Sequence, residues 1–274
     1  HCIVGETEHP FTINFSRDDV RITTNYHADL VASSLYSVVH EGGHALYELH
    51  VGRELSRTCL GGGVSMAIHE SQSRFYENII GRSRAFCGVI YPWLREHFAP
   101  RLDDVSLEDF YRMINKAQPS LIRTEADELT YCLHIMVRYE LERRMFAGEL
   151  TAHDLPAQWN RLYKAYLGVD VPNDREGILQ DSHWANGNIG YFPSYAIGSA
   201  YGAQYLRQMQ KDFDVSAAVA TGRLTQINRW LEEKIWKYGC MKDPTPLFES
   251  VCGPFDPTCY TAYLRDKFTE VYGL

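Results

Sequence analysis

The chain has 274 residues, of which 45% are hydrophobic and 23% are charged, and its formal net charge at pH 7 is −8. This composition is that of an ordinary globular protein, and the length suits one large domain or two small ones. Acidic and basic residues are intermixed, without a block of Lys and Arg that could follow a phosphate backbone or an anionic membrane surface. We therefore expect neither nucleic acid nor a membrane as a partner.

The cysteines and the hydropathy of the chain bear on its compartment. Seven cysteines, an odd number, are scattered without the Cys-x-x-Cys spacing of a zinc knuckle or a redox site. No apolar run approaches the roughly 20 residues of a membrane span, and no secretory leader pattern opens the chain. Reduced thiols in a cytoplasmic protein are the simplest interpretation.

The predicted elements begin with strands and continue with helices. Residues 11–15 and 20–26 are rich in β-branched and aromatic residues and are separated by Ser-Arg-Asp-Asp, which predicts a β-hairpin. Apolar residues recur at helical spacing from 28 to about 51, the glycine-rich stretch 59–66 ends that pattern, and a second helix is predicted from about Ser65. Further helices are predicted over 106–116, 120–147, 155–167, 196–211, 215–220, 223–237 and 258–271, separated by Pro92, Pro119, Pro156, Pro172, Pro193 and the stretch 243–257. The pattern predicts one mainly α unit with a small β element near its start.

The segment His-Glu-Gly-Gly-His, residues 40–44, carries the strongest chemical signal. His40 and His44 are four residues apart on the predicted first helix, so their rings share one face and can meet one ion. Glu41 lies about 100° round the helix, where it cannot easily share that ion but can act on a water molecule beside it. Chance occurrence of the pattern in two ordinary histidines is the alternative. A buried His-Glu-His group without a metal, however, would lose hydration without compensation.

A catalytic zinc ion normally takes three protein ligands and keeps one position open, so a third ligand is required. Glu48 lies about 12 Å further along the helix axis than His40 and is predicted to be a solvated or capping carboxylate. Glu70 is the better candidate, because it lies on a second helix after a glycine-rich turn that can reverse the chain. Its neighbour His69 points elsewhere and is interpreted as a core histidine or a contact of the ligands.

Five segments together resemble a known family. HPFTINFSRDDVRITTNY, HEGGHALYE, IHESQSRFYEN, LIRTEADELTYCLHIMVRYELE and LQDSHWANGNIGYFPSYAIG resemble, in that order, the signature blocks of the M32 (carboxypeptidase Taq-type) metallocarboxypeptidases. The resemblance implies a mainly α, groove-bearing gluzincin fold of the neurolysin and angiotensin-converting-enzyme type. It also implies zinc on His40, His44 and Glu70, with Glu41 as general base.

The length departs from the family pattern, since members are usually about twice as long and their N-terminal half walls one side of the groove. We expect residues 1–274 to form a single metallopeptidase catalytic domain. Two alternatives stay open: the catalytic half of a longer chain, or a short member that closes its groove by forming a homodimer.

Removal of C-terminal residues requires a cation for the terminal carboxylate, and a planar Arg suits this contact. Arg123, Asp127, Thr130, His134 and Arg138 recur at offsets that give one polar stripe on the predicted helix 120–147. A solvated face is the alternative. With the resemblance we expect a groove-facing stripe in which Arg123 binds the substrate carboxylate and Asp127 orients Arg123.

Peptide hydrolysis also builds negative charge on the carbonyl oxygen, so hydrogen-bond donors should face it. His183 and Tyr191 resemble the His and Tyr that stabilise the transition state in related helical gluzincins. Tyr195 is assigned to substrate binding, at either the terminal carboxylate or the oxyanion. Trp184 and Phe192 are interpreted as core residues.

The remaining block, Asp-Asp-Val-Arg-Ile-Thr-Thr, has two interpretations. Its strand is placed to pair with an extended substrate by β-addition. Alternatively, Asp19 and Arg21 form a structural pair.

The sequence therefore predicts a cytoplasmic zinc metallocarboxypeptidase, with Co²⁺ or Mn²⁺ as alternative metals, that acts on peptides with a free C-terminus. Glu41 would take a proton from water and pass it to the leaving amine. The alternatives are an oligopeptidase or dipeptidyl carboxypeptidase of the same fold, and a non-catalytic half-protein that binds peptide or metal.

Overall fold

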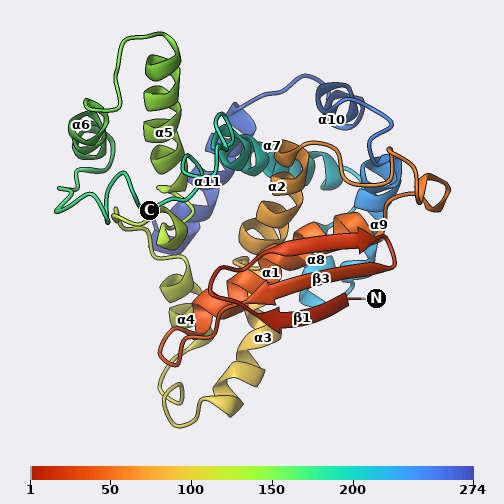
Figure 1. The fold of residues 1–274 in the computed structure, drawn as a ribbon. Coiled ribbons are helices and arrows are strands. Elements are labelled where there is room, and N and C mark those ends of the chain that lie inside the picture. Colours follow the sequence, from red (N-terminus) through yellow and green to blue (C-terminus); the bar gives the residue numbers. More distant parts are fainter. Residues whose placement is uncertain (1) are drawn as a thin grey trace. The chain divides into compact units, whose positions relative to one another are not determined.

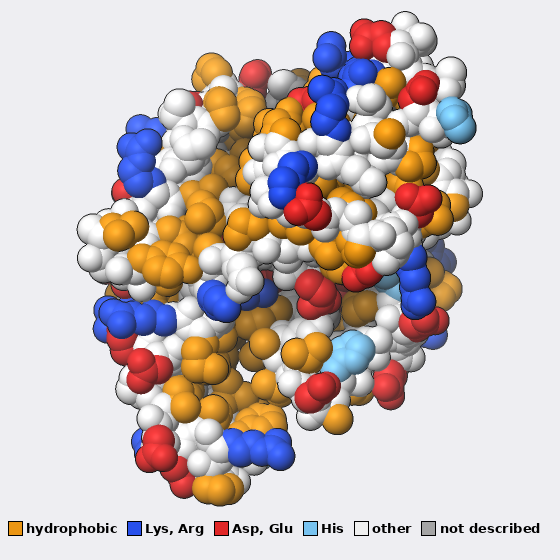
Figure 2. Space-filling view, turned by 90° about the vertical axis from the view of Figure 1, so that its left-hand side faces the viewer, with side chains coloured by type: hydrophobic (Ala, Val, Ile, Leu, Met, Phe, Trp, Pro, Cys, Tyr) orange, Lys and Arg blue, Asp and Glu red, His pale blue; other side chains and the backbone are white. Residues whose placement is uncertain are grey.

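The computed structural model describes residues 2–274, a mainly helical chain with one small sheet near its N-terminus (Figure 1). This confirms the predicted mainly α fold. On the face shown in Figure 2, Lys and Arg side chains lie among Asp and Glu side chains, as the intermixed sequence predicts. Among residues 2–274, every helix is too short or too polar to cross a membrane. The helices are α1 (Val31–Leu49), α2 (Met66–Arg74), α3 (Arg84–His97), α4 (Leu107–Ile114), α5 (Tyr131–Phe146), α6 (Leu155–Leu167), α7 (Pro193–Met209), α8 (Val215–Ala220), α9 (Leu224–Lys234), α10 (Pro244–Cys252) and α11 (Thr258–Tyr272).

The chain divides into two compact units. The first unit comprises the residues up to Ile114 together with Gly198–Leu274, and the second comprises Asn115–Ile197. Each unit carries one of the two polar clusters described below. Whether the two units act as a single catalytic domain stays a prediction.

The sheet of the first unit has the strand order β1-β3-β2, in which β3 (Asp19–Thr24) pairs in parallel with β1 (Cys2–Glu6) and antiparallel with β2 (Thr12–Ser16). The predicted hairpin is therefore confirmed, and β1 is an addition that the sequence reasoning missed. Because β3 is hydrogen-bonded on both sides, the hypothesis that its own edge binds an extended substrate is wrong. The edge strand next to α1 is β2.

The sheet packs across helix α1, as Figure 1 shows. Val20 and Ile22 of β3 are buried against Ala45 of α1. Because successive side chains of a strand point to opposite faces, these two residues lie on the same face of the sheet, the one that packs on α1. Arg21 lies on the opposite face, where its guanidinium forms an exposed bidentate pair with Asp19. The structural interpretation of that pair is the one that the geometry favours.

One predicted helix was wrong in its first part, and two helices were missed. The segment 120–147 is not one helix, because a short turn η3 (Arg123–Glu125) precedes α5. Asp127 accepts hydrogen bonds from the backbone N–H and the hydroxyl of Thr130, so this carboxylate belongs to the turn before α5 and does not continue a helical stripe. Pro92 lies on an exposed position inside α3, a helix that the sequence reasoning missed. The missed helix α10 begins at Pro244, a first-turn position where a proline loses no hydrogen bond.

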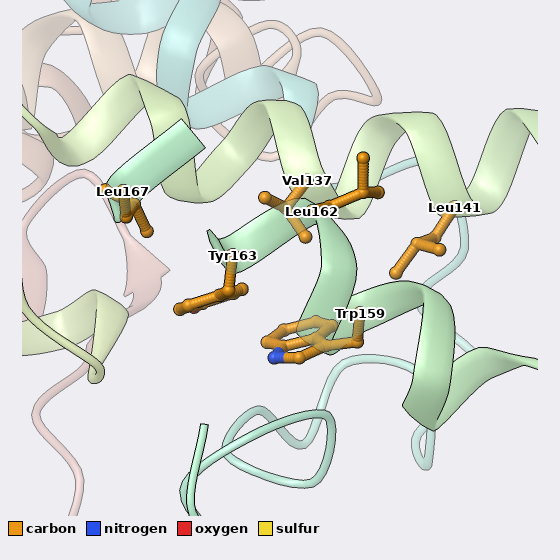
Figure 3. Close-up of a cluster of buried hydrophobic side chains, with 6 residues drawn as sticks. All are labelled: Val137, Leu141, Trp159, Leu162, Tyr163 and Leu167. Carbon is orange, nitrogen blue, oxygen red and sulfur yellow. The ribbon is translucent and has the colours of Figure 1, made fainter. Parts of the chain in front are cut away.

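The core of the second unit forms between α5 and α6, and Figure 3 shows side chains of the two helices pointing toward one another. The helical spacing of apolar residues in both segments produces this face. Its buried members are Val137, Leu141, Trp159, Leu162, Tyr163 and Leu167.

Candidate metal centre and arginine network

Three side chains of the first unit converge on one point. The Nε2 atoms of His40 and His44 lie 3.7 and 3.9 Å from the two carboxylate oxygens of Glu70. One donor atom from each residue lies within 4.8 Å of the others. Two imidazoles and a carboxylate at such spacing fit a zinc ion that keeps one coordination position open. The structure thus brings together the three residues that the sequence analysis named.

A close contact between α1 and α2 places Glu70 beside the histidines. A Cβ at Gly43 would lie 2.6 Å from Cα of Ser73 and 2.7 Å from the carbonyl oxygen of Gln72. Only glycine allows the two helix backbones to approach this closely. The hydroxyl of Ser73 in turn donates a 2.9 Å hydrogen bond to Oε2 of Glu70. Gly43, the second glycine of the His-Glu-Gly-Gly-His segment, therefore allows α2 to bring Glu70 close to the two histidines.

Glu77 supports the first histidine, and sequence reasoning missed it. Its Oε2 lies 2.8 Å from Nδ1 of His40 and 3.2 Å from Nη1 of Arg74. Burial opposes ionisation of Glu77, but Arg74, His40 and Arg82 outweigh it and lower the pKa of Glu77 to about 2. An ionised Glu77 accepts a hydrogen bond from Nδ1–H of His40, which leaves the lone pair of Nε2 of His40 for an ion. Its position seven residues after Glu70 was the available signal.

Glu41 is buried and stays outside the group of converging donors. The hydroxyl of Thr12, on the edge strand β2, donates a 2.6 Å hydrogen bond to Oε2 of Glu41. Burial raises the pKa of Glu41, and the charge of Glu70 acts in the same direction, while His40 and Thr12 act against them. Glu41 is thus a fixed carboxylate next to the donor group.

Glu48 is buried, so the prediction of a solvated carboxylate was wrong. It accepts hydrogen bonds from His69 at 2.8 Å, from the backbone N–H of Gly63 at 2.9 Å and from Asn14 at 2.6 Å. His69 lies against His44, in agreement with its interpretation as a contact of the ligands. Burial, together with the charges of His40 and His69, lowers the pKa of His44 well below its ordinary value.

The second unit holds a buried network around Asp181. Arg123 donates to Oδ1 of Asp181 from Nε at 2.8 Å, and Arg138 donates to Oδ2 from Nε at 2.7 Å. A second Arg123 nitrogen donates to the hydroxyl of Tyr131 at 2.8 Å. The expected partner Asp127 was therefore wrong, because the carboxylate that orients Arg123 comes from a position 58 residues away. Two guanidinium groups share one carboxylate, which leaves a positive charge in the network.

The other named residues of this unit lie against one another, and two of them, Phe192 and Tyr195, lie beside the guanidinium of Arg123. Nε2 of His183 lies 3.0 Å from the Tyr195 hydroxyl, and the ring centroids of His183 and Tyr191 are 5.3 Å apart. The guanidinium carbon of Arg123 lies 4.9 Å from the ring centroid of Tyr195. Phe192 is buried, in line with its interpretation as a core residue.

The sequence matches the family described as carboxypeptidase Taq (M32) metallopeptidase over residues 1–268. The chain belongs to this family. It is 44% identical over 271 residues to carboxypeptidase 1 of Bacillus subtilis, an alignment that covers 98% of this chain and 54% of that protein. It is also 44% identical over 262 residues to thermostable carboxypeptidase 1 of Pyrococcus furiosus, covering 95% of this chain and 52% of that protein.

Solved structures agree with this membership. The crystal structure of an M32 carboxypeptidase from Deinococcus radiodurans superposes with a TM-score of 0.96 at 42% identity, covering 100% of this chain and 56% of that one. Trypanosoma cruzi metallocarboxypeptidase 1 superposes with a TM-score of 0.92 at 37% identity, covering 97% of this chain and 56% of that one. The chain spans about half the length of the curated relatives it matches. The predicted resemblance to the family is confirmed.

Proposed function

We propose that the protein is a zinc-dependent metallocarboxypeptidase that removes residues from peptides with a free C-terminus. The observation that carries the proposal is the convergence of His40, His44 and Glu70, with the buried carboxylate of Glu41 next to them but outside the donor group. Membership of a metallopeptidase family, and relatives that are named carboxypeptidases, support it.

His40, His44 and Glu70 would hold the ion through two imidazole nitrogens and a carboxylate. A bound Zn²⁺ supplies Lewis acidity, which lowers the pKa of water and polarises a carbonyl group. Glu41 takes the proton from the attacking water and returns it to the leaving amine. The hydrogen bond from Thr12 fixes the orientation of the Glu41 carboxylate before the reaction begins.

The second unit supplies the proposed substrate contacts. Arg123 binds the terminal carboxylate, because its network with Asp181 and Arg138 retains a net positive charge. His183 and Tyr191 donate hydrogen bonds to the carbonyl oxygen as negative charge builds on it. Tyr195, whose hydroxyl lies beside His183, binds either the terminal carboxylate or the oxyanion.

The identity of the metal, the cellular location and the oligomeric state are also proposed. Zn²⁺ is preferred to Co²⁺ or Mn²⁺ because two imidazoles and one carboxylate are a common catalytic zinc set. A cytoplasmic location and a homodimer stay predictions. Light scattering on the purified protein tests the homodimer, and a monomer would contradict it.

Product analysis tests the reaction and separates it from its alternatives. The purified protein with added Zn²⁺ is incubated with one peptide that has a free C-terminus and with its C-terminally amidated twin. Release of single residues from the free acid alone is expected. Release of dipeptides, or internal cleavage of both peptides, would favour the oligopeptidase or dipeptidyl carboxypeptidase alternative. Binding of the peptide without any cleavage would favour the non-catalytic alternative.

A further inference from the structure

Two side chains link the second metal-binding imidazole to the glycine-rich loop after α1. Nδ1 of His44 lies 3.3 Å from Nδ1 of His69, and Nε2 of His69 lies 2.8 Å from Oε1 of Glu48. The side chains of His44, His69 and Glu48 are only 11%, 13% and 8% exposed, so water does not compete freely for these hydrogen bonds. All three residues belong to the first unit.

The direction of the two hydrogen bonds that join His44, His69 and Glu48 follows from the partners of Glu48. The Glu48 carboxylate accepts from the backbone N–H of Gly63 and from the Asn14 amide, and an ionised carboxylate has no proton to donate. With a neutral ring, His69 donates from Nε2 to this carboxylate and keeps the lone pair of its Nδ1. The hydrogen-bond partner that fits this lone pair is a protonated Nδ1 of His44.

We propose that His69 and Glu48 are positioning residues of the metal centre, which hold His44 in the tautomer that presents the lone pair of Nε2 to the ion. The inference rests on the proposed metal function of His44. It gives His44 the same kind of support that His40 receives directly from Glu77, with one imidazole inserted between ligand and carboxylate. Such outer partners fix the orientation of a ligand and raise its basicity.

The glycine-rich loop is part of this support. A Cβ at Gly63 would lie 2.3 Å from Nε2 of His69 and 2.7 Å from Cε1 of Tyr47, so any side chain there displaces the His69 ring. A Cβ at Gly62 would meet only Oε2 of Glu48, at an ordinary 3.9 Å. Two adjacent glycines thus differ in their predicted effect on a metal ion that neither of them contacts.

The experiment measures Zn²⁺ affinity by competition with a chromophoric chelator, and the melting temperature of each metal-free variant. H69F removes the acceptor for His44, and we expect zinc affinity to fall by about 10- to 100-fold. H69Q offers an oxygen to His44 and an N–H group to Glu48, so it should recover most of the affinity. G63A should weaken zinc binding, while the matched control G62A should leave it unchanged.

Each outcome bears on a different part of the inference. Zinc affinity in H69F equal to that of the wild type would overturn the role of His69. Equal losses in H69F and H69Q would overturn the hydrogen-bond explanation and leave ring packing as the cause. A lower melting temperature of metal-free G63A with unchanged zinc affinity would remove the loop from the inference. Failure of the wild type to bind zinc would instead overturn the proposed metal function.

Discussion

The polar cluster of the first unit and that of the second have opposite charge balance. His40, His44 and Glu70 bring three donor groups together, with the carboxylate of Glu77 beside His40. Arg123 and Arg138 bring two cations to the single carboxylate of Asp181. The first arrangement suits a bound cation and the second suits a bound anion. The proposed function assigns the metal ion to the first cluster and the terminal carboxylate of the substrate to the second.

The largest expected effect comes from E41Q, which tests the chemistry assigned to the first cluster. Gln keeps the shape of Glu41 but cannot accept the proton, so kcat should fall by about 10²- to 10⁴-fold. Zinc content should stay at the wild-type level, because Glu41 lies outside the donor group. Steady-state kinetics and metal analysis of the same sample check both parts. Activity close to that of the wild type would exclude Glu41 as the base.

D181N tests whether the second cluster depends on the carboxylate of Asp181, which its two arginines share. The substitution removes the charged partner of two buried guanidinium groups, so the free energy of unfolding should decrease by about 3–5 kcal/mol. D170N, in the same unit, breaks an exposed pair with Lys164 and should cost less than about 1 kcal/mol. Denaturant unfolding of both variants gives the comparison. Equal stability of the two would show that the network contributes little.

R123A tests whether the positive charge of the second cluster binds substrate. Loss of this charge-assisted contact should lower kcat/KM for free-acid peptides by about a hundredfold. Amidated peptides should be poor substrates of the wild type and should change little in the variant. The ratio of the two rates separates substrate binding from any general loss of stability. A variant that cleaves free-acid peptides as well as the wild type would show that another cation anchors the carboxylate.

The smallest effect concerns His134, which is buried beside Arg138. Burial and the charges of Arg138 and Arg123 lower the pKa of His134 to about 3. In the unfolded chain His134 is protonated below about pH 6.5, whereas in the folded chain it stays neutral down to about pH 3. The free energy of unfolding therefore decreases as the pH falls below about 6.5. H134Q should remove this contribution, which amounts to about 1.4 kcal/mol per pH unit. Unfolding curves of wild type and variant at about pH 7 and 5 should diverge, and parallel curves would contradict the expectation.

Local spacing explains which features the sequence could predict. His40 and His44 follow from a four-residue repeat on one helix, and the hairpin follows from two strand patterns with a short turn. The features that were missed depend on distant contacts. Asp181 reaches Arg123 across 58 residues, whereas the local candidate Asp127 bonds to Thr130 at the turn before α5. Glu77 lies on the π-helical segment Phe75–Ile80, whose turn differs from that of an α-helix.

The pairing of β1 with β3 was missed for the same reason. The two strands pair in parallel, and β2 lies between them in the sequence. Every residue of β1 is also exposed. An exposed edge strand carries no strong alternation of apolar and polar residues. Sequence patterns therefore predict elements better than the partners that those elements choose.

A zinc titration of the wild type and of E70A tests the proposed metal centre most directly. The wild type should bind about one ion per chain through His40, His44 and Glu70, since a catalytic zinc takes three protein ligands. E70A should lose affinity by more than the roughly 10- to 100-fold expected for an outer partner such as His69. Undiminished zinc binding by E70A would contradict the assignment of the third ligand and, with it, the proposed centre.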